Sequence, residues 1–283
     1  MLSYRHAFHA GNFADVLKHL VQVEILNYLK QKDKPFAYID THAGAGIYSL
    51  SSEEAGKNEE FRTGISILKG KPLAGTEDYL EVVAGCKPEW DKSAVPAAGL
   101  YPGSPRIAQQ MLRAQDSAHL FELHPQDFRR LDAMVARDRR MHAHNSDGFS
   151  GLLGLLPVAE RRALVLIDPP YEVKSDYDTL VETVKKAHRK FATGVYALWY
   201  PVVDRQRIDK MEKALINSGI PRIQLFELGV GEDTEGRGMT SSGMIVINPP
   251  FTLMGNMQKL LPQLTQRLAG DNGVWRCEEL VGE

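Results

Sequence analysis

The tetrapeptide Asp168-Pro-Pro-Tyr171 is the part of the chain best suited to chemistry. It follows an apolar run, Ala163–Ile167, which reads as a buried strand that delivers Asp168 to the edge of a sheet. A planar amino group has two N–H bonds: the Asp168 carboxylate can accept one and the Pro169 carbonyl the other, while the Tyr171 ring stacks on the base. This grip turns the nitrogen lone pair toward a methyl donor, so the tetrapeptide predicts methylation of an amino group on a planar base.

A second group of candidate residues lies in a glycine turn, Asp40-Thr-His-Ala-Gly-Ala-Gly46, which follows a predicted strand at 36–40. Glycines such as Gly44 allow a backbone to approach a ligand that a Cβ would keep away. The turn matches G-x-G-x-x-G only in part, and the chain has no G-x-x-x-x-G-K-[ST] phosphate loop. Two interpretations therefore stay open, a nucleotide-binding turn and a purely local strand-to-turn connection.

Two acids follow the next two predicted strands. Glu122 ends the strand near 118–123, where a carboxylate can accept hydrogen bonds from both hydroxyls of a ribose. It lies much further along the chain from the glycine turn than the usual spacing of about 20 residues, and an insertion accounts for the excess. Asp147 follows the strand near 141–145 and can bond an adenine amino group, although Asn145-Ser-Asp-Gly148 is also ordinary helix N-cap chemistry. Ligands of such sheets bind at the carboxyl edge, so the three strand ends together predict a nucleotide site.

Short β-rich runs alternate with helical patterns, which predicts an α/β fold on a doubly wound, seven-stranded, mostly parallel sheet. We expect strands near 36–40, 118–123, 141–145, 163–167, 195–200, 223–228 and 244–247, and helices near 13–31, 105–114, 126–136, 177–191, 205–217 and 256–268. Residues 1–283 form one domain. Residues 51–99 are too long for one crossover and predict an inserted, mostly helical subdomain. Residues 229–243 predict a binding loop or a disordered connection.

The overall charge argues against a protein that coats nucleic acid. Lys and Arg total 34 against 36 for Asp and Glu, a formal net charge of −2, which leaves room only for a local basic strip. The two cysteines, Cys86 and Cys277, fit no metal or disulfide spacing, and the histidines follow no zinc pattern, so we expect no metal. The N-terminus lacks a signal-peptide layout and no run approaches ~20 apolar residues. We expect a cytoplasmic protein with no membrane partner.

Five motifs taken together resemble one family. They are Ser3-Tyr-Arg-His-Ala-Phe-His-Ala-Gly-Asn12, Ala14-Asp-Val-Leu-Lys-His19, Asp40-Thr-His-Ala-Gly-Ala-Gly46, Tyr101-Pro-Gly-Ser-Pro105 and Ile167-Asp-Pro-Pro-Tyr171. The chain is similar over essentially its whole length to the RlmJ family of bacterial 23S ribosomal RNA adenine-N6 methyltransferases. The resemblance implies a Rossmann-like class I methyltransferase fold, S-adenosylmethionine as cofactor, and methyl transfer to the exocyclic N6 of one specific adenine in 23S ribosomal RNA.

The resemblance also implies roles for individual residues. Asp168 would hold the target amine and accept its proton, and Tyr4, His6 and Lys18 would lie by the target adenosine. The S-adenosylmethionine pocket would be lined by His19, His42, Gly44, Ser104, Glu122, Asp147, Gly148 and Asp168. The modest net charge favours a short stretch of protein-free RNA as substrate, and we expect a monomer that clamps this RNA between its N-terminal arm and residues 229–243.

A second copy of the tetrapeptide pattern occurs at Asn248-Pro-Pro-Phe251. In a methyltransferase-like sheet the last strand runs antiparallel to its neighbours, so its end points away from the cofactor edge. The strand that ends at Asp168 finishes beside the glycine turn instead. We therefore expect Asp168 to act on the amine and Asn248 to be a turn residue.

Two other classes of protein stay open. A DNA adenine-N6 methyltransferase would share the tetrapeptide but usually carries a separate sequence-reading region, which only residues 51–99 could supply here. A non-catalytic RNA-binding module on the same fold should lack an intact pocket, yet the glycine turn, Glu122, Asp147 and Asp168 are all present. Labelled methyl transfer to ribosomal RNA or to duplex DNA separates these classes.

Overall fold

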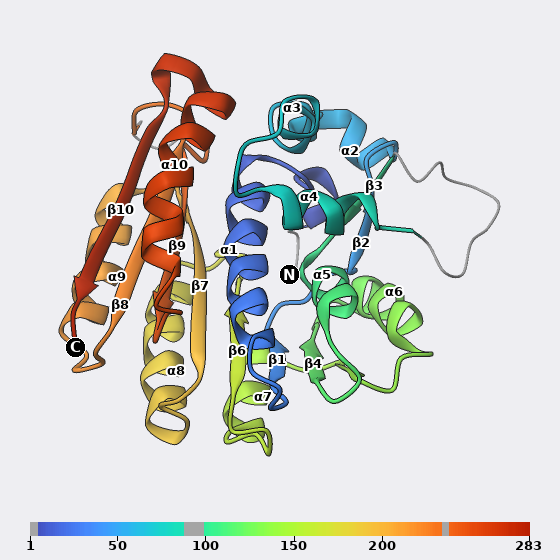
Figure 1. Ribbon diagram of the computed structural model, residues 1–283, viewed down its shortest axis with the longest axis vertical. Coiled ribbons are helices and arrows are strands. Elements are labelled where there is room, and N and C mark those ends of the chain that lie inside the picture. Colours follow the sequence, from blue (N-terminus) through green and yellow to red (C-terminus); the bar gives the residue numbers. More distant parts are fainter. Residues whose placement is uncertain (1–4, 88–98, 234–237) are drawn as a thin grey trace.

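The computed structural model describes residues 5–87, 99–233 and 238–283, and one large sheet runs through it (Figure 1). In the described residues this sheet has eight strands in the order β10-β8-β9-β7-β6-β1-β4-β5. They are β1 (Ala37–Asp40), β4 (Ser117–Phe121), β5 (Met141–His144), β6 (Ala163–Ile167), β7 (Val195–Val202), β8 (Ile223–Gly229), β9 (Ser241–Ile247) and β10 (Val274–Val281). The five strands from β5 to β7 are parallel, whereas β9 is antiparallel to β7 and β8. The predicted Rossmann-like methyltransferase fold is confirmed, with one strand added.

Helices cover both faces of the sheet, which is why the central strands are apolar on both sides. One core lies under α1 (Phe13–Lys30), α5 (Ser104–Met111), α6 (Pro125–Val135) and α10 (Leu253–Ala269). The other lies under α7 (Gly148–Leu155), α8 (Asp176–Lys190) and α9 (Arg205–Ile216). Figure 1 shows α1 crossing the middle of the sheet, so this helix can bring side chains to the ends of the central strands.

The predicted insertion leaves and re-enters the domain through two short antiparallel strands, β2 (Ile47–Ser49) and β3 (Leu100–Pro102). Its described part holds α2 (Glu53–Asn58), the 3-10 turn η2 (Glu60–Arg62), α3 (Ile65–Gly70) and α4 (Glu77–Ala84), which lie together at one end of the molecule (Figure 1). Ile65, Leu68 and Tyr79 are buried and join the core under α1. The insertion is thus packed onto the domain through an apolar contact.

Three features differ from the sequence predictions. β10 was not predicted; it forms one edge of the sheet beside β8, and Val274 and Trp275 on it are 40% and 47% exposed. α7 was anticipated only as possible cap chemistry at its first residues. Residues 241–243 belong to β9, so the segment expected at 229–243 shortens to 230–240, of which 234–237 lie outside the described residues. Within the described ranges, none of the helices is long and apolar enough to cross a membrane.

Candidate active site

Asp15, in the first turn of α1, gathers the polar groups of the N-terminal segment. It is 2% exposed, and its carboxylate accepts hydrogen bonds from the His6 ring at 2.8 Å, the Gly11 backbone N–H at 2.8 Å and Lys18 Nζ at 3.0 Å. Burial alone would raise the pKa of Asp15, but His6 and Lys18 outweigh burial and hold this pKa well below its usual range. Asp15 is therefore a carboxylate that fixes the positions of both neighbours.

The insertion supports the same segment from outside. Glu60 accepts hydrogen bonds from the His9 ring at 2.8 Å and from the Asn12 amide at 2.9 Å. Asn12 is also the N-cap of α1, because its side-chain oxygen accepts the Asp15 backbone N–H at 2.9 Å. The start of α1 is thus held by the insertion and by its own cap.

Lys18 joins α1 to the end of β6. Its Nζ lies 2.6 Å from Asp168 Oδ2 and 3.0 Å from Asp15 Oδ1, and its side chain is 5% exposed. Burial would lower the pKa of Lys18, but the two carboxylates outweigh burial and raise it. A charged Lys18 is therefore clamped between them, while Asp168, with 17% of its side chain exposed, stays open to solvent.

A cavity of about 940 Å³ opens in front of Asp168 along the carboxyl ends of β6, β1 and β4. Every residue expected at the cofactor lines it, namely His19, His42, Gly44, Ser104, Glu122, Asp147, Gly148 and Asp168. His6, Lys18 and Pro169, expected at the substrate, line it too. Tyr171 does not line it, and Tyr4 lies outside the described residues. The cavity is large enough for a nucleoside-sized cofactor together with a base.

The glycine turn and Glu122 brace each other in one wall of this cavity. Glu122 accepts hydrogen bonds from the backbone N–H groups of Gly44 at 2.8 Å and His124 at 2.6 Å, and burial raises the pKa of Glu122. Gly44 has φ +62°, and a Cβ there would lie 2.3 Å from the Tyr48 hydroxyl. The turn therefore requires glycine at this position, and its geometry aims the Glu122 carboxylate at the cavity.

The helix-cap interpretation of Asn145-Ser-Asp-Gly148 is what the structure shows. The Asp147 carboxylate accepts hydrogen bonds from the Ser150 backbone N–H at 2.9 Å and from the Ser150 hydroxyl at 2.7 Å, so it caps α7. A Cβ on Gly148 would lie 1.8 Å from the Thr41 carbonyl oxygen, so only glycine lets α7 approach β1 this closely. Asp147 is exposed and also lies at the cavity wall.

Two histidines and a buried acid lie in the part of the site where the cofactor is expected. Burial lowers the pKa of His42 to about 4 and that of His19 to about 3, so both rings are neutral near pH 7. His19 Nδ1 hydrogen-bonds with the Tyr101 hydroxyl at 2.7 Å, whereas His19 Nε2 is buried without a hydrogen-bond partner among the described residues. The Ser104 hydroxyl donates to Asp40 at 2.6 Å, and burial raises the pKa of Asp40 to about 6. His19 Nε2 is thus open to a polar group of a ligand.

The residues 230–240 that join β8 to β9 border the same cavity through Val230, Gly238 and Met239. Arg205, the first residue of α9, donates two hydrogen bonds to the buried Glu227 carboxylate, at 2.9 and 2.8 Å. Its Nε also donates to the Asp233 carboxylate at 2.6 Å. This ion pair ties the described beginning of the loop to α9.

The two copies of the tetrapeptide pattern lie at opposite edges of the sheet. β9 pairs antiparallel with β7, and Ile247 at its end is the partner of Tyr196 near the start of β7. Asn248 has φ +53°, and its side-chain amide donates to the Thr193 and Gly194 carbonyls at 3.2 and 3.3 Å. The predicted antiparallel direction of the last core strand is confirmed, and Asn248 lies in a turn far from Asp168.

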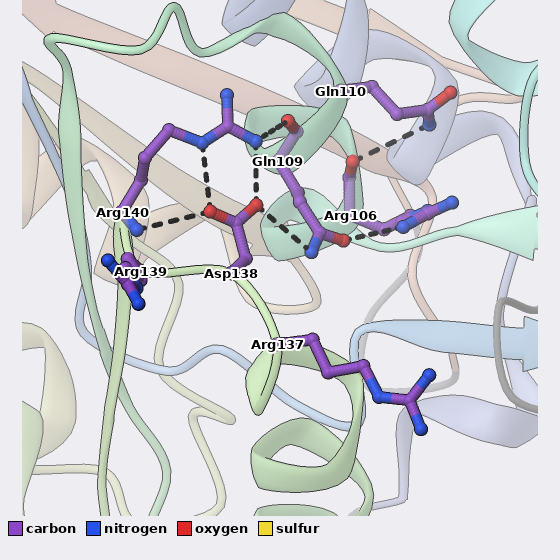
Figure 2. A pocket seen from close by; sticks show the side chains of 7 residues that line it. All are labelled: Arg106, Gln109, Gln110, Arg137, Asp138, Arg139 and Arg140. Atoms are coloured by element: carbon purple, nitrogen blue, oxygen red, sulfur yellow. Dashed lines mark hydrogen bonds and ion pairs between the residues drawn. The ribbon is translucent and has the colours of Figure 1, made fainter.

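A second, smaller hollow of about 250 Å³ lies between α5 and the turn before β5. Figure 2 shows Arg140 forked onto Asp138 with bonds of 2.9 and 2.6 Å, while Arg106 donates to the Gln109 side chain at 2.6 Å. Arg140 also donates to the Gln109 backbone carbonyl at 3.1 Å. These contacts join α5 to the amino-terminal edge of the sheet, and we assign this hollow to packing.

Sequence reasoning gave no role to two residues that the structure brings to the site. Asp15 was overlooked although it stands three and four positions before Lys18 and His19, the spacing that puts side chains on one helix face. Trp199 lines the cavity beside Asp168, and no local motif marks it.

Comparisons with known proteins point to one family. Residues 33–281 match the family described as Ribosomal RNA large subunit methyltransferase D, RlmJ. The chain is 50% identical over 270 residues to Ribosomal RNA large subunit methyltransferase J of Escherichia coli K12, covering 95% of this chain and 94% of that protein. It is 46% identical over 286 aligned positions to the protein of the same name from Haemophilus influenzae, covering 100% of both.

A solved structure supports the fold over the same length. The crystal structure of a protein from Legionella pneumophila str. Philadelphia 1 is 33% identical, with a TM-score of 0.85, and covers 96% of this chain and 98% of that one. The family match spans most of the chain, and both named relatives are covered almost completely. The chain therefore belongs to the RlmJ family of ribosomal RNA large subunit methyltransferases.

Proposed function

We propose that this chain transfers a methyl group from S-adenosylmethionine to the exocyclic N6 of one adenine in 23S ribosomal RNA. The observation that carries the proposal is Asp168 at the end of β6, open to the cavity and held by Lys18 at 2.6 Å, beside a braced glycine turn. The names of the two relatives point to the large ribosomal subunit as the source of the RNA. The substrate is taken to be protein-free RNA, and the enzyme to act as a cytoplasmic monomer.

The residues on the cofactor side fit S-adenosylmethionine. The Glu122 carboxylate has lone pairs left for two ribose hydroxyls beyond its two backbone bonds. The buried His19 Nε2, which has no hydrogen-bond partner in the described part of the chain, suits a polar group of the amino-acid end. The sulfonium of this cofactor supplies an electrophilic methyl group. Glu122 and His19 orient the two ends of the cofactor, and His42 and Gly148 shape the wall between them.

Asp168 and Pro169 act on the other reactant. One N–H of the amine donates to the Asp168 carboxylate and the other to the Pro169 carbonyl, which favours a pyramidal nitrogen with an available lone pair. The new N–C bond forms as the S–C bond breaks, its electron pair stays on sulfur, and the extra proton leaves the nitrogen for Asp168. Lys18 keeps Asp168 in place before the amine arrives.

Methyl transfer from labelled cofactor to a 23S ribosomal RNA transcript tests this proposal, with duplex DNA as the competing substrate. We expect label in the RNA only, and Asp168→Asn should lower the rate about 100-fold or more because it removes the proton acceptor. Asn248→Gly is the matched control, since glycine tolerates φ +53° and the position lies at the other sheet edge; it should stay within about twofold. Label in DNA alone, or an active Asp168→Asn enzyme, contradicts the proposal.

A further inference from the structure

Trp199 stands beside Asp168 on the neighbouring strand. β6 and β7 are parallel, with Ile167 opposite Leu198, so one step further Asp168 is level with Trp199. Side chains alternate along a strand, and Leu166 and Ala197, two residues earlier on each, belong to the core under α1. Trp199 packs against that same core. Asp168 and Trp199 therefore project from the same face of the sheet.

The Trp199 ring is held in one orientation. Its Nε1 donates to the Ser242 hydroxyl at 2.8 Å, and Ser242 is fully buried on β9. Lys18 Nζ lies over the ring, 5.6 Å from its centroid. Because Lys18 also binds Asp168, the ring face under Lys18 lies toward Asp168.

Tyr171 lies outside the cavity, with its ring 6.0 Å from that of Trp199. It packs against the core under α8, with its ring 4.4 Å from that of Tyr177. Its hydroxyl donates to the Trp199 backbone carbonyl at 2.5 Å, and its φ is +52°, a conformation that an L residue adopts only when its surroundings hold it. The tyrosine of the tetrapeptide thus braces the ends of β6 and β7 and lies outside the cavity.

The wall of the cavity around Trp199 is apolar. Pro201 and Val203 follow it on the same chain segment, and Val230 and Met239 approach from the β8–β9 connection. A flat base needs an aromatic surface within reach of the groups that bind its amine, and the indole meets both conditions.

We propose that Trp199, and not Tyr171, provides the surface on which the target adenine stacks while Asp168 and Pro169 hold its amine. The inference rests on the proposed function and adds a substrate-binding residue to it. Ser242 is a positioning residue, because it acts on the base only through the indole.

The first test separates binding of the base from folding. Trp199→Leu should lower kcat/KM for the 23S RNA transcript about 5- to 150-fold, the loss expected for one base–aromatic stack. Trp199→Phe should recover part of that loss because it keeps a ring. S-adenosylhomocysteine affinity of both variants should match the parent, which shows that the cofactor side and the fold are intact. A Trp199→Leu enzyme within twofold of the parent overturns the inference.

The second test is spectroscopic and needs no turnover. A chain with Trp90→Phe and Trp275→Phe keeps Trp199 as its single tryptophan. With S-adenosylhomocysteine saturating the cofactor side, added adenosine should quench its fluorescence, and uridine should quench it less. Absence of quenching by adenosine overturns the stack. A parent enzyme that quenches but transfers no methyl group to 23S RNA overturns the proposed function and leaves the stack standing.

Discussion

Replacing Asp15 by asparagine tests whether the start of α1 organises the active site. Asp15 is 2% exposed and accepts bonds from His6, Gly11 and Lys18 at 2.8, 2.8 and 3.0 Å. Asparagine keeps the shape and one acceptor oxygen but removes the charge, so at least one charge-assisted bond of about 1.5–3 kcal/mol is lost. Lys18 keeps Asp168 as a partner, which limits the further cost. We expect the free energy of unfolding to fall by about 2–4 kcal/mol.

That loss should lower Tm by about 3–7 °C, measured by calorimetry. It should also lower kcat for RNA methylation about tenfold or more, because Lys18 loses its ion pair with Asp15 and so holds Asp168 less firmly in one place. Asp209→Asn, an exposed aspartate on α9, is the matched control and should change neither quantity. A fully active Asp15→Asn enzyme with an unchanged Tm refutes the idea that this carboxylate holds the site together.

Three other predictions follow from the cofactor side. Gly148→Ala should lower the free energy of unfolding by about 3 kcal/mol or more, because its Cβ would lie 1.8 Å from the Thr41 carbonyl oxygen. Gly154→Ala in the same helix is the control: its Cβ would have no neighbour within 4 Å, so this change should be neutral or stabilising. Glu122→Gln should weaken S-adenosylhomocysteine binding about tenfold in calorimetric titration, with a smaller effect on Tm. Burial lowers the pKa of His19 to about 3, so below about pH 6.5 the unfolded chain binds a proton at this histidine and the folded chain does not. The free energy of unfolding should therefore fall as the pH drops from about 6.5 toward 3. In denaturant titrations, His19→Gln should make the free energy of unfolding less dependent on pH over this range.

Much of the fold could be predicted because parallel strands buried on both faces leave short apolar runs bounded by turns. β6 was recognised in this way, and its end at Asp168 coincides with the tetrapeptide. β10 was not predicted because an edge strand with a solvated face has an alternating, partly charged sequence. In one short segment this pattern is a weak signal for a strand. α7 escaped because its glycines and its short length hide the helical period.

Side-chain direction was harder to predict than position. Tyr171 follows Asp168 by three residues, which suggests a ring beside the amine, yet after two prolines and with a left-handed φ its ring packs against the core under α8, outside the cavity. The aromatic residue that does reach the cavity, Trp199, comes from another strand and is revealed only by the pairing of β6 with β7. Which aromatic side chain reaches the cavity depends on contacts between strands, and a local sequence motif does not show these contacts.

The antiparallel pair β2–β3 brings the two ends of the insertion together. Tyr48 is opposite Tyr101, and the Gly103 backbone N–H donates to the Gly46 carbonyl at 2.9 Å. Closing a longer loop at such a joint costs little extra entropy, since the cost grows only with the logarithm of loop length. The insertion can therefore change in length at this seam while Gly44 and Ser104 keep their places, provided that Glu60 and the buried residues Ile65, Leu68 and Tyr79 are retained. A graft of another protein's insertion across the seam is the natural way to ask what this segment contributes to the choice of RNA.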